Sequence, residues 1–220
     1  MTVVRTTTTA LLDALRAVRS AVGTDPELPM LSGVLLDAGE EGVRLVASDR
    51  YRLAVRTLPA ELDGSPVSAI LPIALVDELL SLAVSGPAAV RVDGSEVTVE
   101  VSGRELRGQR VDADFPDYRP LVRGAGSSQV DVDVARFRDE LAAAPTRTVP
   151  TGPDGAEETA TVLTLGDVEL GVNREFLLQA LDAQGAGQLE LDLDGPLAPL
   201  ALRDPARPGD VTLLMPIRLP

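Results

Sequence analysis

Paired carboxylates are the residues of this chain whose type and spacing could do chemistry. Asp77–Glu78, Asp131/Asp133 and Glu157–Glu158 each bring two acids close together, as a general acid and base or a metal site requires. Acids make up 34 of 220 residues, so such pairs arise from composition alone, and none is accompanied by a second cluster. The chain has no His and no Cys, which removes the commonest general base, the commonest zinc ligands and a thiolate nucleophile. We therefore expect a non-catalytic protein with no cofactor and no metal; an enzyme working through carboxylates alone is the weakest alternative.

The C-terminal run LLMPIRLP, Leu213–Pro220, is the second unusual feature. Chain ends are usually polar and poorly ordered unless they are tied down. An apolar end therefore requires either burial as the last strand of a core or a place in a binding surface. The run alone favours the first interpretation.

The overall composition limits the partners. Hydrophobic residues account for 45% of the chain, aromatic residues for only 2%, and the net charge is −14 with every basic residue an Arg. Such an acidic balance argues against a generic nucleic-acid coat but leaves a locally basic surface open. The longest apolar candidate, ILPIALVDELLSLAV, is interrupted by Asp77 and Glu78 and falls short of the roughly 18 to 20 residues that a membrane span needs. With no signal peptide evident, we expect a cytoplasmic protein with no membrane partner.

The elements that must position these residues follow one plan twice. Apolar residues at helical spacing predict helices in TTTTALLDALRAVRSAVG, with threonine caps, and in LPIALVDELLSLAV, which begins near Pro72. Strands with alternating apolar residues follow each helix, joined by a Gly-Glu-Glu-Gly turn and an Asp93-Gly94 turn. The second half repeats the order, with helices in VDVARFRDELAAA and VNREFLLQALDAQG and strands after each.

A Pro-, Gly- and Ser-rich stretch, DFPDYRPLVRGAGSSQ, separates the halves and marks a module boundary. We predict an α+β fold of two modules, residues 1–124 and 125–220, each with two helices packed on antiparallel sheet.

Three segments together resemble the bacterial DNA sliding clamp, the β subunit of DNA polymerase III. They are LVASDRYRLAV (Leu45–Val55), DFPDYR (Asp114–Arg119) and the terminal LLMPIRL; LPMLSGVLL (Leu28–Leu36) resembles the start of the middle module's sheet. The order and spacing of these segments match the family over about 190 residues. The match is to its middle and C-terminal modules only. The resemblance implies a scaffold of similar modules that encircles DNA, with helices lining the hole and sheets forming the outer wall.

The resemblance also implies a binding role for the apolar end. In the family, the terminal M-P-x-R-L packs beside the D-G-H-R-L turn and forms a groove that takes short hydrophobic peptides of polymerase and repair proteins. Carried onto matching positions, the groove residues are Leu31, Ser48, Arg50, Tyr51, Arg52, Leu53, Pro116, Asn173, Phe176, Leu200, Met215, Pro216, Ile217 and Arg218. Leu and Met give an adaptable apolar wall, and Arg52 and Arg218 can hold carbonyls or a carboxylate. The SDRYRL turn has a second interpretation, compatible with the first, in which Asp49 caps the turn.

Duplex DNA is the second partner that the resemblance implies. The arginines on or near the predicted helices would face phosphates: Arg16, Arg19, Arg136, Arg138 and Arg174. Alternatively, they lie on solvated helix faces, paired with Asp13, Asp139 and Glu140. The second predicted helix has no basic residue, and both interpretations stay open.

Three departures from the family pattern accompany the match. The second module is short, with room for one strand pair where the family has two, which leaves its ring-closing edge uncertain. Arg50 stands where the family prefers Gly and Tyr51 where it has His, and Pro220 follows the usual terminal Leu. The resemblance implies a ring of six modules, which this two-module chain would complete only with three copies or with a partner chain. The alternative is a monomeric, non-ring binding domain derived from a clamp, such as the C-terminal part of a transcription regulator.

Overall fold

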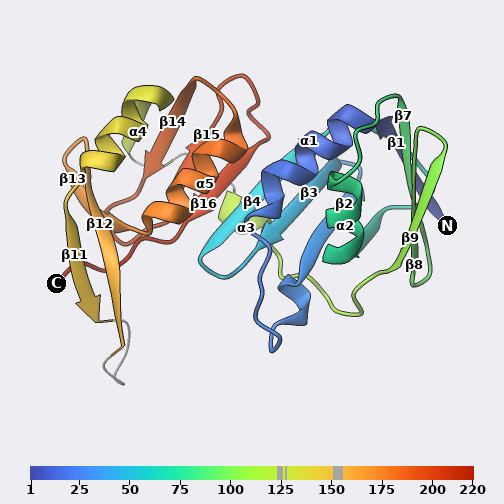
Figure 1. Ribbon diagram of the computed structural model, residues 1–220, viewed down its shortest axis with the longest axis horizontal. Coiled ribbons are helices and arrows are strands. Elements are labelled where there is room, and N and C mark those ends of the chain that lie inside the picture. Colours follow the sequence, from blue (N-terminus) through green and yellow to red (C-terminus); the bar gives the residue numbers. More distant parts are fainter. Residues whose placement is uncertain (123–125, 127, 151–155) are drawn as a thin grey trace. The chain divides into compact units, whose positions relative to one another are not determined.

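The alternating segments of the sequence form antiparallel strands in the computed structural model, which describes residues 1–122, 126, 128–150 and 156–220 (Figure 1). Strands and helices divide between two compact units, Met1–Tyr118 and Arg119–Pro220. The predicted module boundary, between residues 124 and 125, lies outside the described residues. The predicted α+β class is confirmed.

Unit 1, Met1–Tyr118, contains two runs of hydrogen-bonded strands. One is a five-stranded sheet in the order β5 (Glu61–Asp63), β1 (Thr2–Thr7), β7 (Pro87–Asp93), β8 (Glu96–Val101) and β9 (Arg104–Gln109). The other runs β4 (Arg52–Leu58), β3 (Gly42–Ser48), β2 (Gly33–Gly39) and β6 (Val67–Pro72). Between Arg19 and β2 lies the short helix η1 (Pro29–Leu31).

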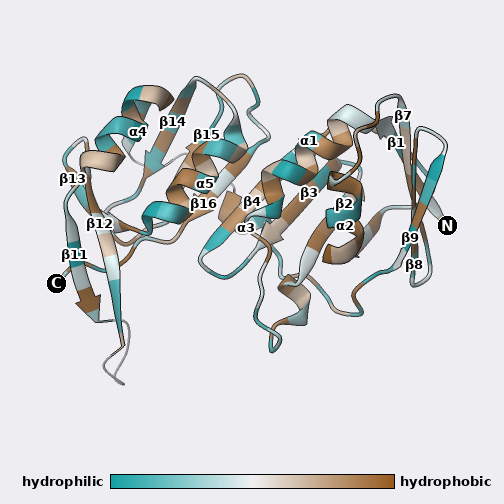
Figure 2. Cartoon of the chain, viewed as in Figure 1, coloured by the Kyte–Doolittle hydropathy of each residue, from teal (hydrophilic) through white to brown (hydrophobic). Residues whose placement is uncertain are grey.

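Two helices of unit 1 pack on these strands and on each other: α1 (Thr8–Arg19) and α2 (Ile73–Leu80). Figure 2 shows that each helix has a hydrophobic and a hydrophilic side, and the buried residues between helices and strands are almost all Leu, Val and Ala. The predicted threonine cap is confirmed, since the Thr7 hydroxyl accepts the Ala10 N–H at 3.2 Å. The second helix is shorter than predicted because the Ser81 hydroxyl donates to the Glu78 carbonyl at 2.6 Å and ends it.

Unit 2, Arg119–Pro220, repeats the plan with seven described strands against nine in unit 1. Its strands run β10 (Ser128–Asp133), β14 (Gln188–Leu193), β15 (Leu200–Arg203) and β16 (Val211–Leu214) in one order, and β11 (Thr146–Pro150), β12 (Glu157–Leu165) and β13 (Val168–Val172) in a separate sheet. Its helices are α3 (Arg119–Val122), α4 (Val134–Ala143) and α5 (Arg174–Gln184). The expectation of a single strand pair between the two longer helices is wrong, because β11, β12 and β13 all fit there.

The FPDY segment is fastened to unit 1 by the buried Tyr118. The Tyr118 hydroxyl donates to Asp37 Oδ2 on β2 at 2.6 Å. Burial and then this hydrogen bond raise the pKa of Tyr118 to about 12. The segment that follows β9 is therefore held against the β2–β3 side of the unit.

The β3–β4 hairpin turns at Ser48–Arg52 through side-chain contacts to the backbone. Asp49 Oδ1 accepts the N–H groups of Tyr51 at 3.0 Å and Arg52 at 2.7 Å, which confirms the Asp49 cap. Arg50 has φ +80°, a left-handed conformation that favours Gly. Arg50 therefore adopts the turn at a cost in free energy, at a position where the resemblance to the family implies Gly.

Replacing Arg50 by Gly should raise the free energy of unfolding of unit 1 by about 1 kcal/mol, because the left-handed conformation costs a residue with Cβ about that much. Gly94→Ala is the matched control of opposite sign: its φ is +59° and nothing crowds its Cβ position, so it should destabilise by a similar amount. Urea unfolding followed by circular dichroism measures both. A neutral Arg50→Gly beside a destabilising Gly94→Ala would contradict this account of the turn.

Tyr118→Phe should destabilise unit 1 by about 1 kcal/mol, since the Asp37 carboxylate loses a hydrogen bond. Tyr118 has a pKa above its ordinary value, so its contribution is complete below about pH 10 and is lost as the pH rises towards about 12. The chain has two tyrosines, and Tyr51→Phe leaves Tyr118 alone to report phenolate absorbance. Titration of that remaining phenol near pH 10 would refute the assignment.

Candidate functional site

The predicted groove residues fall into two sets of seven, one in each unit. The unit 1 set is Leu31, Ser48, Arg50, Tyr51, Arg52, Leu53 and Pro116, and the unit 2 set is Asn173, Phe176, Leu200, Met215, Pro216, Ile217 and Arg218.

Leu31 and Ser48 meet across a glycine that sequence reasoning missed. The Gly23 N–H donates to the Leu31 carbonyl at 2.9 Å. A Cβ on Gly23 would lie 3.1 Å from the Leu31 Cβ and 3.4 Å from the Ser48 carbonyl oxygen. The chain after α1 thus approaches both residues closely, which a larger side chain would prevent; a Gly soon after a helix was the available signal.

The Ser48–Leu53 corner exposes different side chains from those expected. Arg52 is largely buried, with Nε and Nη2 each 2.8 Å from Asp49 Oδ2, so much of its guanidinium supports the turn. Leu53 is buried. Tyr51 is 56% exposed, and the Arg50 guanidinium lies 5.8 Å from its ring centroid. The accessible chemistry of this corner is therefore an aromatic ring with a cation beside it.

The apolar C-terminal run combines a buried strand with an anchored tail. Leu213 and Leu214 end β16 as buried residues, whereas Met215 is 46% exposed. Beyond it, the Ile217 N–H donates to the Gly171 carbonyl on β13 at 2.8 Å and forms an isolated antiparallel bridge. The first part of the run thus completes a core, as the first interpretation predicts, and the second part is held at the surface, while its place in a binding surface stays a prediction. Gly171 was missed by sequence reasoning.

Asn173, Phe176 and Leu200 lie around this tail with different exposures. Asn173 caps α5 by accepting the Phe176 N–H at 3.1 Å, and Phe176 is half-buried against the core. Leu200 pairs with Leu214 across β15 and β16 and is fully buried, so it supports the strand from beneath. In unit 1, Pro116 is exposed, two residues before the anchored Tyr118.

The five helix arginines all contact their own chain. Arg19 donates two hydrogen bonds, of 2.6 and 3.0 Å, to the Asp77 carboxylate, and this contact lowers the pKa of Asp77. The other pairs are Arg16 with Asp13 at 3.0 Å, Arg136 with Glu140 at 2.9 Å and Arg138 with Asp182 at 2.5 Å, while Arg174 donates to the Thr161 hydroxyl and the Ala144 carbonyl. These contacts favour the paired-face interpretation, with partners that differ in part from those expected.

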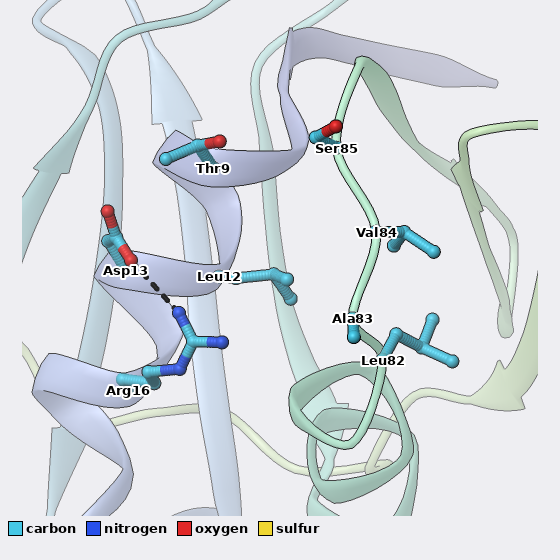
Figure 3. A pocket seen from close by; sticks show the side chains of 8 residues that line it. All are labelled: Thr9, Leu12, Asp13, Arg16, Leu82, Ala83, Val84 and Ser85. Atoms are coloured by element: carbon cyan, nitrogen blue, oxygen red, sulfur yellow. Dashed lines mark hydrogen bonds and ion pairs between the residues drawn. The ribbon is translucent and has the colours of Figure 1, made fainter.

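A hollow of about 350 Å³ lies on the α1 side of unit 1, between α1 and the Leu82–Ser85 loop. Figure 3 shows Thr9, Leu12, Asp13 and Arg16 of α1 lining one wall, with the Arg16 guanidinium tied to Asp13. An anion entering there would meet Arg16 together with its own carboxylate partner, which weakens the attraction.

One member of each of two predicted carboxylate pairs has a role in local structure. Asp77 holds Arg19, and Asp133 caps α4 by accepting the Arg136 N–H at 3.0 Å and also accepts from the Gln188 amide. Among residues 1–122, 126, 128–150 and 156–220, no group of three His, Cys, Asp or Glu could hold a metal ion. Within the same described residues, no helix is long and apolar enough to cross a membrane.

Comparison with known proteins identifies the fold and the family. The family model described as "DNA polymerase III beta subunit, central domain" matches residues 6–117, which is nearly all of unit 1. The beta sliding clamp of Caulobacter vibrioides is 25% identical over 240 residues, covering 96% of this chain and 64% of the relative. The Escherichia coli K12 clamp is 24% identical over 212 residues, covering 86% and 58%. The chain therefore spans about 64% of the length of the Caulobacter relative.

Solved clamp structures share the fold over the whole chain. The Thermotoga maritima DNA polymerase III beta subunit superimposes with a TM-score of 0.81 at 21% identity, covering 100% of this chain and 66% of that one. The Bartonella birtlesii sliding clamp, bound to griselimycin, gives a TM-score of 0.77 at 20% identity, covering 99% and 66%. The match of the central-domain model to more than half of the residues, in the order of elements described above, shows that this chain belongs to the bacterial DNA polymerase III beta subunit, or beta sliding clamp, family.

Proposed function

We propose that the chain is a non-catalytic clamp scaffold whose two residue sets bind short hydrophobic peptides of polymerase or repair proteins. The observation that carries the proposal is selective exposure. Only five large hydrophobic side chains among the described residues are exposed, and Tyr51 and Met215, one from each set, are two of them. Both residues occupy positions that the resemblance to the family assigns to the groove, and this coincidence favours a binding surface over chance exposure.

The chemistry of the two sets fits such a ligand. The Met215 thioether adapts to apolar side chains of different shape, and Pro216 fixes the backbone beside it. Arg50 and Arg218 are exposed guanidinium groups that can hold peptide carbonyls or a carboxylate. The Bartonella birtlesii clamp binds griselimycin, which supports ligand binding by a protein of this fold.

A second candidate is a clamp-derived binding domain that forms no ring, for example as part of a larger regulator. The helices favour it: α1, α2, α4 and α5 carry the five arginines named above against seven carboxylates, namely Asp13, Asp77, Glu78, Asp139, Glu140, Glu175 and Asp182. A surface without net positive charge gains little from releasing DNA counterions. In the first candidate, by contrast, three chains would supply a six-module ring around duplex DNA.

Met215→Arg should weaken the binding of a short peptide with a Leu and an aromatic anchor at least tenfold, or about 1.4 kcal/mol, because a charge replaces the apolar wall. Leu197→Arg is the matched control: Leu197 is 49% exposed in the same unit but outside the predicted groove, so its variant should bind within about twofold of wild type. Fluorescence anisotropy with the labelled peptide measures both. Equal loss in the two variants, or wild-type protein that binds no such peptide, would contradict the groove.

The two candidates differ in size and in DNA retention. The second candidate predicts a monomer in sedimentation velocity. Because the helix arginines are already paired, it also predicts no retention on nicked circular DNA at about 150 mM salt. Arg16→Glu/Arg136→Glu should then leave the weak binding seen at low salt changed by less than about threefold. A three-chain assembly that stays on circular DNA and leaves linear DNA would instead establish the ring.

A further inference from the structure

We infer that Gly171, with Ala160 beside it, is a positioning site that latches the C-terminal tail onto β13. This inference rests on the proposed function for its consequence, because the tail carries Met215 and Arg218, but its geometry lies entirely within unit 2.

The tail approaches β13 more closely than any residue with a side chain would allow. A Cβ built on Gly171 would lie 2.7 Å from the Ile217 carbonyl oxygen and 2.8 Å from Leu219 Cδ2, both shorter than real Cβ contacts. The same Cβ would lie 3.3 Å from the Ala160 Cβ on β12. Gly171 and the fully buried Ala160 thus form a slot of small residues for Leu219, while the Gly171 carbonyl accepts the Ile217 N–H.

A corresponding backbone hydrogen bond, called here a join, occurs in unit 1, and comparing the two shows what differs in unit 2. There, the Val111 N–H donates to the Ile70 carbonyl at 3.0 Å, again as an isolated antiparallel bridge. Ile70 lies three residues before α2 begins at Ile73, and Gly171 lies three residues before α5 begins at Arg174. Both joins fasten the segment after the last strand to the strand before the second helix. In unit 1 the residue that accepts this hydrogen bond, Ile70, has a side chain. In unit 2 the tail occupies the space that a side chain on Gly171 would need.

The latch fixes the tail at a point two residues beyond Met215 and two residues before the α5 cap, Asn173. Without it, the tail would lose the Ile217–Gly171 hydrogen bond and the packing of Leu219 beside Gly171 and Ala160. Peptide binding would then include the entropy cost of ordering this segment, at about 1 kcal/mol or more per residue. Gly171 therefore acts through the tail, which covers the space at its Cβ position.

The test compares Gly171→Ala and Gly171→Val with Gly187→Ala. Gly187 lies in the same unit with nothing within 4 Å of a Cβ and without a positive φ, so its variant should behave as wild type. Hydrogen exchange measured by mass spectrometry on the C-terminal segment reports the latch directly. We expect the protection of the Ile217 amide to fall at least tenfold in Gly171→Val and less in Gly171→Ala, with exchange in α4 and α5 unchanged. Should Gly171→Val fail to fold by circular dichroism, Leu219→Ala empties the slot from the tail side and should also lower Ile217 protection.

Unchanged Ile217 protection in the folded Gly171 variants would overturn the latch, whatever the peptide result. Peptide titration of the same variants separates the two proposals. A loss of both protection and peptide affinity supports the latch and its role. A loss of protection with full affinity leaves the latch standing and overturns the proposed groove.

Discussion

One backbone join recurs in this protein, and the surface features depend on it. In each unit the segment that leaves the last strand hydrogen-bonds to the strand before the second helix, Val111 to Ile70 and Ile217 to Gly171. The join in unit 1 precedes the FPDY segment, and the join in unit 2 lies within the PIRL segment, both of which belong to the resemblance to the family. A chain leaving a sheet edge is otherwise free to take many conformations, and fixing it early is what lets a few residues present a defined surface. Tyr118 adds a second attachment in unit 1, whereas unit 2 relies on the slot at Gly171.

The charge distribution and the fold favour different conclusions about DNA binding. The resemblance to sliding clamps implies helices that face DNA, but here the helix arginines contact acids, a hydroxyl or backbone of their own unit. An arginine bound by a carboxylate at 2.6 Å, as Arg19 is by Asp77, must exchange one anion for another to meet a phosphate. That exchange gains little free energy in water, where an exposed pair contributes at most about 1 kcal/mol. The fold and the electrostatics of the chain are thus separable properties, and the pairing of the helix arginines favours the second candidate proposed above.

Sequence reasoning reached the elements that repeat with a regular period and missed those set by local exceptions. The strands around the Gly-Glu-Glu-Gly and Asp93-Gly94 turns and the threonine cap could be predicted because periodicity and turn chemistry are local. The early end of α2 depends on one hydroxyl competing for a carbonyl, which the apolar spacing of LPIALVDELLSLAV conceals. Gly23 and Gly171 could not be found for a related reason: their importance lies in the close approach of segments distant in sequence, and no local pattern records it. Arg52 was predicted to hold a peptide carbonyl or carboxylate, as arginines commonly do, but its guanidinium is bound by Asp49.

The two exceptions at Arg50 and Gly171 are opposite solutions to the same backbone problem. At Arg50 the chain keeps a side chain where the conformation favours Gly, and the exposed guanidinium beside Tyr51 is what it gains. At Gly171 the chain gives up a side chain on a strand, where Gly weakens pairing, and the close approach of the tail is what it gains. Natural sequences break local rules mainly where function or assembly offsets the cost. Arg50 and Gly171 lie in different units, each at or near a residue of the predicted groove. The conformational cost at these two residues therefore supports the same two surfaces that the exposure of Tyr51 and Met215 indicates.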